Sequence, residues 1–436
     1  MAEKPESITN KAWNGAFEKY NILERVKNDG YADITADQMR LFREPRLMSK
    51  VDHSQNLPQA FKENKLSILT LSTSEFRIGH FDIFQSLPEW KLPGNEVETL
   101  PFPPNLETLD FTNLTGEPGV INTAYATEML HTFCEQELVL TVSGRMRTSD
   151  FTYSVNTTQG EPQSIRVNRA QMEIDAAYEG DKNFFIFEVK NHMARDFNLR
   201  QLYYPYRTWQ DRIKKKTNPV FLTFSNDVFD LYEYGFETIT DFSSASLVKH
   251  KRYMLTHTQP KVEQLVESAK RGAAAKGKTT RSSTTTFPQA DDFERIVDLV
   301  AYLLEAPRTT DDLTSNYDFD PRQSDYYFNA AKYLGLSTIQ ETEDGTAYLV
   351  ATDEAAKIFA MPYQEKYSAL ADLVLGIQTV ANLYLELLKT GSKPSPSHAE
   401  ELFANSPDSR GLSGTTLGRR ATTALSWANW AYQISK

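Results

Sequence analysis

The chain has 436 residues, of which 40% are hydrophobic, and a single cysteine, Cys134. This length supports about two to four domains with their own cores, and one cysteine excludes an internal disulfide framework and a cysteine-based zinc site. The formal net charge of −11 argues against a general nucleic-acid coat, which binds by neutralising phosphates. It leaves room for a sequence-specific binder with a local basic cleft. No apolar run approaches the roughly 18 residues of a membrane span, and the first residues lack a signal-peptide core, so a cytoplasmic protein is expected.

Residues 1–118 predict a mixed α/β region. A helical pattern ends at Gly30, Thr35 can cap a short second helix, and residues 66–72 and 75–81 have strand patterns. No chemistry follows from these residues. Three basic side chains are open to two interpretations, DNA contact or a solvated surface: Arg43, Arg46 and Lys50.

Residues 171–210 predict a strand, a tight turn, a second strand and a helix. Neighbouring side chains of a strand point to opposite faces, so Glu188 and Lys190 share a face at the end of the second strand. Its other residues are apolar on both faces, which is typical of a strand covered on both sides. If the two strands form a hairpin, Asp175 comes close to both Glu188 and Lys190.

This group of charges has a specific chemical use. Two carboxylates suit Mg²⁺, which takes its remaining ligands from water and substrate phosphate. The metal lowers the pKa of a bound water, and a nearby lysine can orient that water. The pattern therefore indicates phosphodiester hydrolysis. The alternative is a buried ion pair at a strand end, because Glu-x-Lys triplets are common.

Asp175 followed by Glu188-Val189-Lys190 resembles the D…(D/E)-x-K signature of the PD-(D/E)xK nuclease superfamily, with Ile174 in place of the usual proline. The wider stretch from residue 173 to 209 resembles bacterial type II restriction endonucleases, and the similarity extends into both flanks. The resemblance implies an α/β fold with a central mixed sheet flanked by helices, and hydrolysis that leaves 5′-phosphates. Asp175, Glu188 and the Val189 carbonyl would bind Mg²⁺, Lys190 would position the water, and Gln201 would contact that water or the outer shell of the metal.

The flanking helices supply further candidates within a nuclease domain at 119–265. A helical pattern runs from Ile121 to about Val139. Many superfamily members add a metal-binding glutamate on this first helix, for which Glu128 is the first choice, with Glu135 and Glu137 as alternatives. His131 lies one turn beyond Glu128 but is open to a structural role. Candidate phosphate contacts are Arg145 and Arg147 on one strand face and Arg207 on the following helix. For the three glutamates and for Arg207, the alternative is an exposed, solvated side chain.

The remainder of the chain predicts DNA-binding modules. Residues 266–290 are small, polar and basic, which is typical of a flexible linker. Residues 291–361 predict a winged helix, with Glu343-Asp344-Gly345 as the hairpin turn. Three residues lie where a recognition helix reaches base edges: Arg322, Gln323 and Tyr326. A winged helix that makes only protein contacts is the alternative.

Residues 362–436 predict a long apolar helix at 366–390 and a second helix-turn-helix-like module. Arg419 and Arg420 lie near the start of its last helix, and Trp427 and Trp430 are spaced like core residues.

Together these features predict a Mg²⁺-dependent type II restriction endonuclease that cuts double-stranded DNA. Cutting both strands of a palindromic site requires two active sites, so a homodimer is expected, with a cognate DNA methyltransferase as functional partner. The alternatives are a structure-specific or repair nuclease on the same fold, and a non-catalytic winged-helix regulator.

Overall fold

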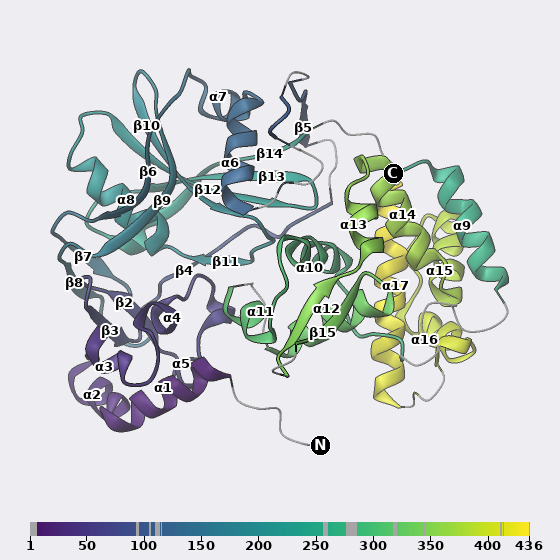
Figure 1. Cartoon of the computed structure of the whole chain (residues 1–436), viewed down its shortest axis with the longest axis horizontal. Coiled ribbons are helices and arrows are strands. Elements are labelled where there is room, and N and C mark those ends of the chain that lie inside the picture. Colours follow the sequence, from purple (N-terminus) through teal and green to yellow (C-terminus); the bar gives the residue numbers. More distant parts are fainter. Residues whose placement is uncertain are drawn as a thin grey trace.

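The computed structural model shows a mixed α/β protein with three parts: an N-terminal unit, a central sheet and a helical C-terminal domain (Figure 1). The described residues are 7–92, 96–103, 106–109, 114, 116–255, 260–275, 286–316, 321–342, 345–409, 412 and 414–435.

The N-terminal unit surrounds a three-stranded antiparallel sheet in the order β1-β3-β2, with strands Tyr31–Thr35, Glu75–Gly79 and Ser67–Thr70. Its helices are α1 (Ile8–Lys19), α2 (Ile22–Asp29), α3 (Ala36–Arg40), α4 (Pro45–Ser49) and α5 (Gln59–Asn64). The short 3-10 turn η1 (Ser54–Asn56) lies between α4 and α5 in the chain. As predicted, a helix ends at Gly30, whose backbone adopts the left-handed conformation, and Thr35 caps α3. The predicted first helix is split in two, because Asn21 also has a positive φ of 47°.

The central sheet has seven strands in the order β5-β14-β13-β12-β10-β9-β6. In that order they are Val97–Leu100, Ala245–Leu255, Val228–Phe236, Lys216–Ser225, Asn183–Lys190, Gln171–Glu179 and Val139–Arg147. β10 pairs with β12 in parallel and with β9 antiparallel, so the sheet is mixed as expected. Helix α8 (Arg200–Gln210) covers one face, and α6 (Gly116–Ala126) and α7 (Met129–Cys134) cover the other. Cys134 is buried in α7.

Short strands connect this sheet to the N-terminal unit. β4 (Phe84–Ser86) pairs with β11 (Asp196–Asn198), and β7 (Phe151–Val155) pairs with β8 (Gln163–Val167) beneath α8 and the 3-10 turn η2 (Phe242–Ser244). Because β11 lies between β10 and α8 in the chain, this pairing brings the N-terminal unit against the end of β10.

The C-terminal domain is helical apart from one hairpin. Its elements are α9 (Val262–Ala274), α10 (Phe293–Glu305), α11 (Thr310–Asn316), α12 (Pro321–Tyr333), β15 (Ser337–Glu341), β16 (Ala347–Ala351), α13 (Asp353–Phe359), α14 (Tyr363–Leu375), α15 (Gln378–Thr390), α16 (Pro396–Ala404), η3 (Pro407–Ser409) and α17 (Thr415–Gln433). One hydrophobic cluster extends from Leu265 to Ile434. The two modules expected at 291–361 and 362–436 therefore share a single core.

Two expectations about this domain are corrected. Within the expected linker, α9 packs against α14 and α15, and Phe287 lies in the core against Trp427. Residues 276–285 lie outside the described residues. In place of the single helix expected at 366–390, the chain forms α14 and α15, with a bend of 114° between them. Among the described residues no single helix is long and apolar enough to cross a membrane.

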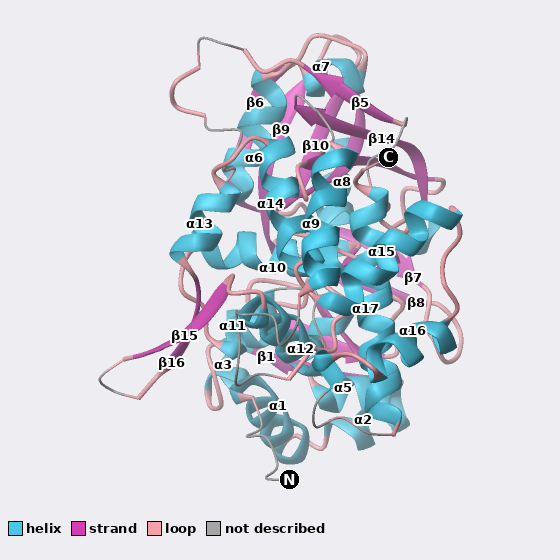
Figure 2. Cartoon of the chain, turned by 90° about the vertical axis from the view of Figure 1, so that its right-hand side faces the viewer, coloured by secondary structure: helices cyan, strands magenta, loops and turns pink. Residues whose placement is uncertain are grey.

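Helices α10, α11 and α12 are followed by the β15–β16 hairpin, the order predicted for residues 291–361. Arg308 adds a third short pairing by exchanging both backbone hydrogen bonds with Leu349 of β16. The hairpin extends away from the body of the molecule (Figure 2). Of its predicted turn, Glu343 and Asp344 lie outside the described residues.

Candidate active site

The β9–β10 hairpin brings the predicted acidic residues together. Phe187 pairs with Ala176, so Asp175 and Glu188 are neighbours on adjacent strands. On the other side, Val142 of β6 pairs with Ala177 but Gly144 pairs with Ile174, so three residues of β9 face two of β6. This irregularity re-aims Asp175, as bulges beside active sites commonly do. The Val189 amide donates to Asp175 Oδ2 at 2.7 Å and fixes the carboxylate at the strand end.

Lys190 lies at the centre of this group. Its Nζ is 2.6 Å from Glu188 Oε1 and 3.2 Å from Glu117 Oε1, and it donates to the Val189 carbonyl at 3.1 Å. Gln201, on the first turn of α8, donates to Glu188 Oε1 at 2.5 Å. Glu188 and Lys190 are both buried. The sequence-predicted residues Asp175, Glu188, Lys190 and Gln201 thus lie together.

Burial and crowding shift the protonation of these groups. Burial raises the pKa of Asp175 to about 6, although Lys190 opposes the shift. Burial also raises the pKa of Glu188 to about 8, with the neighbouring carboxylates adding to it. For Lys190, burial lowers the pKa, but Glu188, Glu117 and Asp175 together hold it above its usual value. The site therefore has more carboxylates than one ammonium can neutralise, which favours a further cation.

The helix glutamate beside the site is Glu117, and this corrects the expectation for Glu128. Glu117 lies in the first turn of α6, whereas Glu128 follows the other end of that helix and pairs with His131 at 2.6 Å. Glu135 pairs instead with Lys249, and Glu137 lies near His131. The sequence missed Glu117 because the helix was expected to begin at Ile121. The Gly-Glu-Pro sequence at 116–118 is the signal of the earlier start.

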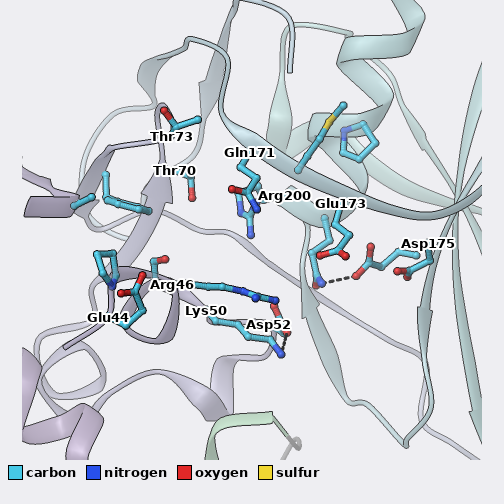
Figure 3. Close-up of a pocket in the computed structure, with 18 of the residues that line it drawn as sticks. Glu44, Arg46, Lys50, Asp52, Thr70, Thr73, Gln171, Glu173, Asp175 and Arg200 are labelled. Atoms are coloured by element: carbon cyan, nitrogen blue, oxygen red, sulfur yellow. Dashed lines mark hydrogen bonds and ion pairs between the residues drawn. The ribbon is translucent and has the colours of Figure 1, made fainter. Parts of the chain in front are cut away.

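The group faces a cleft of about 550 Å³ between the central sheet and the N-terminal unit. Figure 3 shows Asp175 and Glu173 on one side and Arg46, Lys50 and Asp52 on the other. Thr70 and Thr73 of the N-terminal unit also line the cleft, as do Gln171 and Arg200 of the opposite side. Arg46 and Lys50 are exposed, so the cleft carries cations opposite the buried carboxylates. Sequence analysis had found no signal for Arg200.

Contacts from the N-terminal unit hold the two walls together. His53 Nε2 lies 3.1 Å from His192 Nε2, and Ser54 donates its amide to Asp196 Oδ1 at 2.9 Å. Burial and the charges of nearby basic groups lower the pKa of His192 well below its usual value, so it is neutral at pH 7. Burial would raise the pKa of Asp52, but Lys190 and Lys50 lower it, so this carboxylate stays ionised.

The expected phosphate-contacting residues of the sheet have different positions. Arg145 and Arg147 are exposed on the outermost strand β6, paired across from Glu173 and Gln171 at the rim of the cleft. Arg207 is buried, forms an ion pair with Asp211 at 2.9 Å and packs over Phe151. Because its guanidinium is enclosed by protein, the structure contradicts a DNA-contacting role for Arg207.

The residues of the C-terminal domain that were expected to contact DNA lie on α12 and α17. Gln323 is half-buried and Tyr326 is exposed near the start of α12, while the side chain of Arg322 lies outside the described residues. Arg419 is exposed near the start of α17. Arg420 is half-buried, and burial lowers its pKa while nearby Tyr326 raises it. Arg420 of α17 therefore lies near Tyr326 of α12.

The residues present fit a Mg²⁺ ion, although no three His, Cys, Asp or Glu side chains of the described part form a metal-binding cluster. Mg²⁺ usually takes one or two carboxylates and completes its shell with water and substrate phosphate. Asp175 and Glu188 supply two carboxylates, and the Val189 carbonyl a third oxygen. The Gln201 side-chain oxygen is buried without a hydrogen-bond partner, so it has an acceptor left for a bound water.

Comparison with known proteins finds three family matches, each over part of the chain. Residues 10–78 match a domain of unknown function (DUF6996), residues 79–254 match another (DUF6997), and residues 295–436 match a third (DUF7226). No curated protein and no solved structure matches the chain. The boundary between the first two matches falls inside β3, close to the end of the N-terminal unit. The third match covers nearly all of α10 and extends through α17, which agrees with the single core of the C-terminal domain.

Proposed function

We propose that this protein is a Mg²⁺-dependent DNA endonuclease of the PD-(D/E)xK type that resembles type II restriction enzymes. The observation that carries the proposal is the meeting of Asp175, Glu188 and Lys190 at one strand end, inside a cleft whose opposite wall carries the exposed cations Arg46 and Lys50. A buried structural ion pair needs only one carboxylate for the lysine. Here Lys190 contacts two, a third lies beside them, and the group opens to a cleft large enough for substrate phosphate.

Each residue has a role in this proposal. Asp175, Glu188 and the Val189 carbonyl would hold Mg²⁺, which would supply a bound water of lowered pKa and stabilise charge on the phosphate. Glu117 adds negative charge from the facing helix. Lys190 orients the attacking water and places a compact positive charge beside the phosphate. Gln201 fixes the Glu188 carboxylate and offers its free oxygen to the same water. The products would be 5′-phosphate ends.

The substrate would be double-stranded DNA, held by the basic wall and read by the C-terminal domain. Arg46, Lys50 and Arg200 would contact backbone phosphates within the cleft, and Arg145 and Arg147 would do so at its rim. The three helices and hairpin of residues 293–351 would act as a winged helix, in which Arg322, Gln323 and Tyr326 contact base edges. Arg419 and Arg420 would extend this surface.

Cleavage of both strands would require two copies of the chain, so we propose a homodimer that works with a cognate DNA methyltransferase in the cytoplasm. Incubation of the full-length protein with plasmid DNA and Mg²⁺ tests the proposal. Discrete fragments are the expected result. A smear would favour a repair or structure-specific nuclease, and intact DNA bound without cleavage would favour a non-catalytic regulator.

A further inference from the structure

One carboxylate of the C-terminal domain contacts both chain segments that carry the catalytic charges. Glu305, the last residue of α10, accepts a hydrogen bond through Oε1 from the Gly116 amide at 3.0 Å. The same oxygen accepts a bond from the Asn191 side-chain amide. Gly116 directly precedes Glu117, and Asn191 directly follows Lys190. A single oxygen atom thus joins the start of α6 to the end of β10.

The contact with Gly116 has the properties of a helix cap supplied by another domain. The first amides of a helix have no intrahelical acceptor, and negative charge is favourable at this end. Gly116 has a φ of +69°, which side-chain-bearing residues rarely adopt. Glycine therefore permits a conformation in which its amide donates a hydrogen bond to Glu305. The side chain of the next residue, Glu117, contacts Lys190.

A second contact fixes Glu305 itself. Its other oxygen, Oε2, lies 3.1 Å from Arg308 Nη2, and both side chains are largely enclosed, with 17% and 24% exposed. The Arg308 guanidinium packs 4.1 Å from the centre of the Tyr302 ring. The Arg308 backbone is bonded at 3.0 and 2.7 Å to Leu349 of the β15–β16 hairpin. A continuous series of contacts therefore connects the hairpin to Gly116 and Asn191, the neighbours of Glu117 and Lys190.

We propose that Glu305 is a positioning residue for the nuclease site, with Arg308 linking its orientation to the β15–β16 hairpin. This inference rests on the proposed function. By holding Gly116 and Asn191 on one oxygen, Glu305 sets the distance between Glu117 and Lys190. Loss of that oxygen should lower the rate of the chemical step and leave DNA affinity unchanged, because Glu305 lies outside the cleft lining.

The test compares three variants of the full-length protein in cleavage of a plasmid that the wild type cuts. Glu305→Ala removes the shared oxygen. Glu305→Gln keeps one acceptor oxygen for both Gly116 and Asn191. Asp227→Asn is the matched control, since it weakens the 2.5 Å Asp227–Lys366 pair, another contact between the same two domains. We expect kcat to fall by about tenfold or more in Glu305→Ala, with KM within about twofold, and to stay within about threefold of wild type in the other two.

A second readout does not depend on cleavage. Hydrogen exchange of the Gly116 amide should be faster in Glu305→Ala than in wild type, and near wild type in Glu305→Gln and Asp227→Asn. Wild-type kcat or wild-type exchange in Glu305→Ala would overturn the inference, as would equal losses of kcat in Glu305→Ala and Asp227→Asn. If the wild type cuts no DNA, the proposed function fails, while the exchange data alone decide whether Glu305 positions this segment.

Discussion

The two walls of the cleft differ in construction and in charge. The sheet wall is formed by strands covered on both faces, and its functional groups, such as Glu188 and Lys190, are buried and bonded to one another. The opposite wall is formed by the short helices α3 and α4 and the segment after them, and its cations Arg46 and Lys50 are exposed. Under the proposed function, this difference assigns the chemistry to the sheet wall and the attraction of phosphate to the opposite wall.

The division predicts that mutations on the two walls have different kinetic effects. On the sheet wall they should lower kcat, because interactions made in the transition state are lost. On the N-terminal wall they should weaken DNA binding and reduce its salt dependence, because phosphate contacts are lost. Five predictions test the properties of the two walls.

The largest effect is expected for Lys190→Met. Removing the ammonium should lower the cleavage rate by at least about 100-fold, because both water positioning and phosphate charge stabilisation are lost. It also leaves Glu188 and Glu117 without their shared partner. The metal-free variant should therefore unfold at a lower temperature than wild type, and Mg²⁺ should recover part of the loss. Cleavage within about tenfold of wild type would remove Lys190 from the mechanism.

Glu117→Gln should lower the cleavage rate by about tenfold or more, as outer contacts of metal sites commonly do. Glu128→Gln is the matched control, because Glu128 follows the other end of α6 and pairs with His131. It should cut at the wild-type rate. Rates measured at saturating DNA and Mg²⁺ decide between them, and the reverse order of effects would restore Glu128 as the helix glutamate.

The raised pKa values predict a pH dependence of metal binding. Asp175 and Glu188, with pKa values raised to about 6 and about 8, must lose protons to bind Mg²⁺. Affinity for Mg²⁺ should therefore rise by about 100-fold between pH 6 and pH 8, with proton release on binding. Calorimetry in two buffers of different ionisation enthalpy measures both. Affinity that is constant across this range would contradict the raised pKa values.

The same shift has a consequence for stability. The folded state keeps the Glu188 proton up to about pH 8, while the unfolded chain loses it near 4.5. The unfolded state therefore binds fewer protons in this window, so this group lowers the free energy of unfolding as the pH rises from 4.5 to 8. In Glu188→Gln that contribution is absent, and metal-free thermal unfolding should show a smaller decline over the same range.

The smallest effect is expected on the N-terminal wall. Arg46→Ala should weaken DNA binding only a few-fold at moderate salt and reduce the salt slope by about 1, with kcat unchanged at saturating DNA. Lys11→Ala, an exposed change on α1 outside the cleft lining, should alter neither quantity. Binding measured at two salt concentrations tests this. A large fall in kcat for Arg46→Ala would show that the two walls do not divide their roles.

The sequence predicted the β9–β10 hairpin well because the signals there are local. Alternation along β10 placed Glu188 and Lys190 on one face, and the turn after Glu179 fixed the pairing that brings Asp175 beside them. The end of α2 at Gly30 and the cap of α3 at Thr35 were also predicted from single residues with specific backbone roles.

The rest depends on contacts distant in the sequence. Nothing near Glu117 indicates that Glu305, 188 residues later, caps its helix through Gly116. Arg207 belongs to a basic run, yet packing over Phe151 buries it. The polar stretch at 266–290 has a linker composition, but Ala269 of α9 and Phe287 belong to the C-terminal core. Local composition predicts how exposed such a segment usually is, whereas tertiary contacts determine the actual burial of these residues.

The central claim is that the buried charges of the β9–β10 hairpin cleave DNA with the help of Mg²⁺. The most direct measurement is cleavage of plasmid DNA by wild type and Glu188→Gln, with Mg²⁺ and with a chelator in its place. The account predicts discrete fragments only from wild type with Mg²⁺, while Glu188→Gln stays folded and binds the same DNA. Equal cleavage by Glu188→Gln, or by wild type in the chelator, would contradict it.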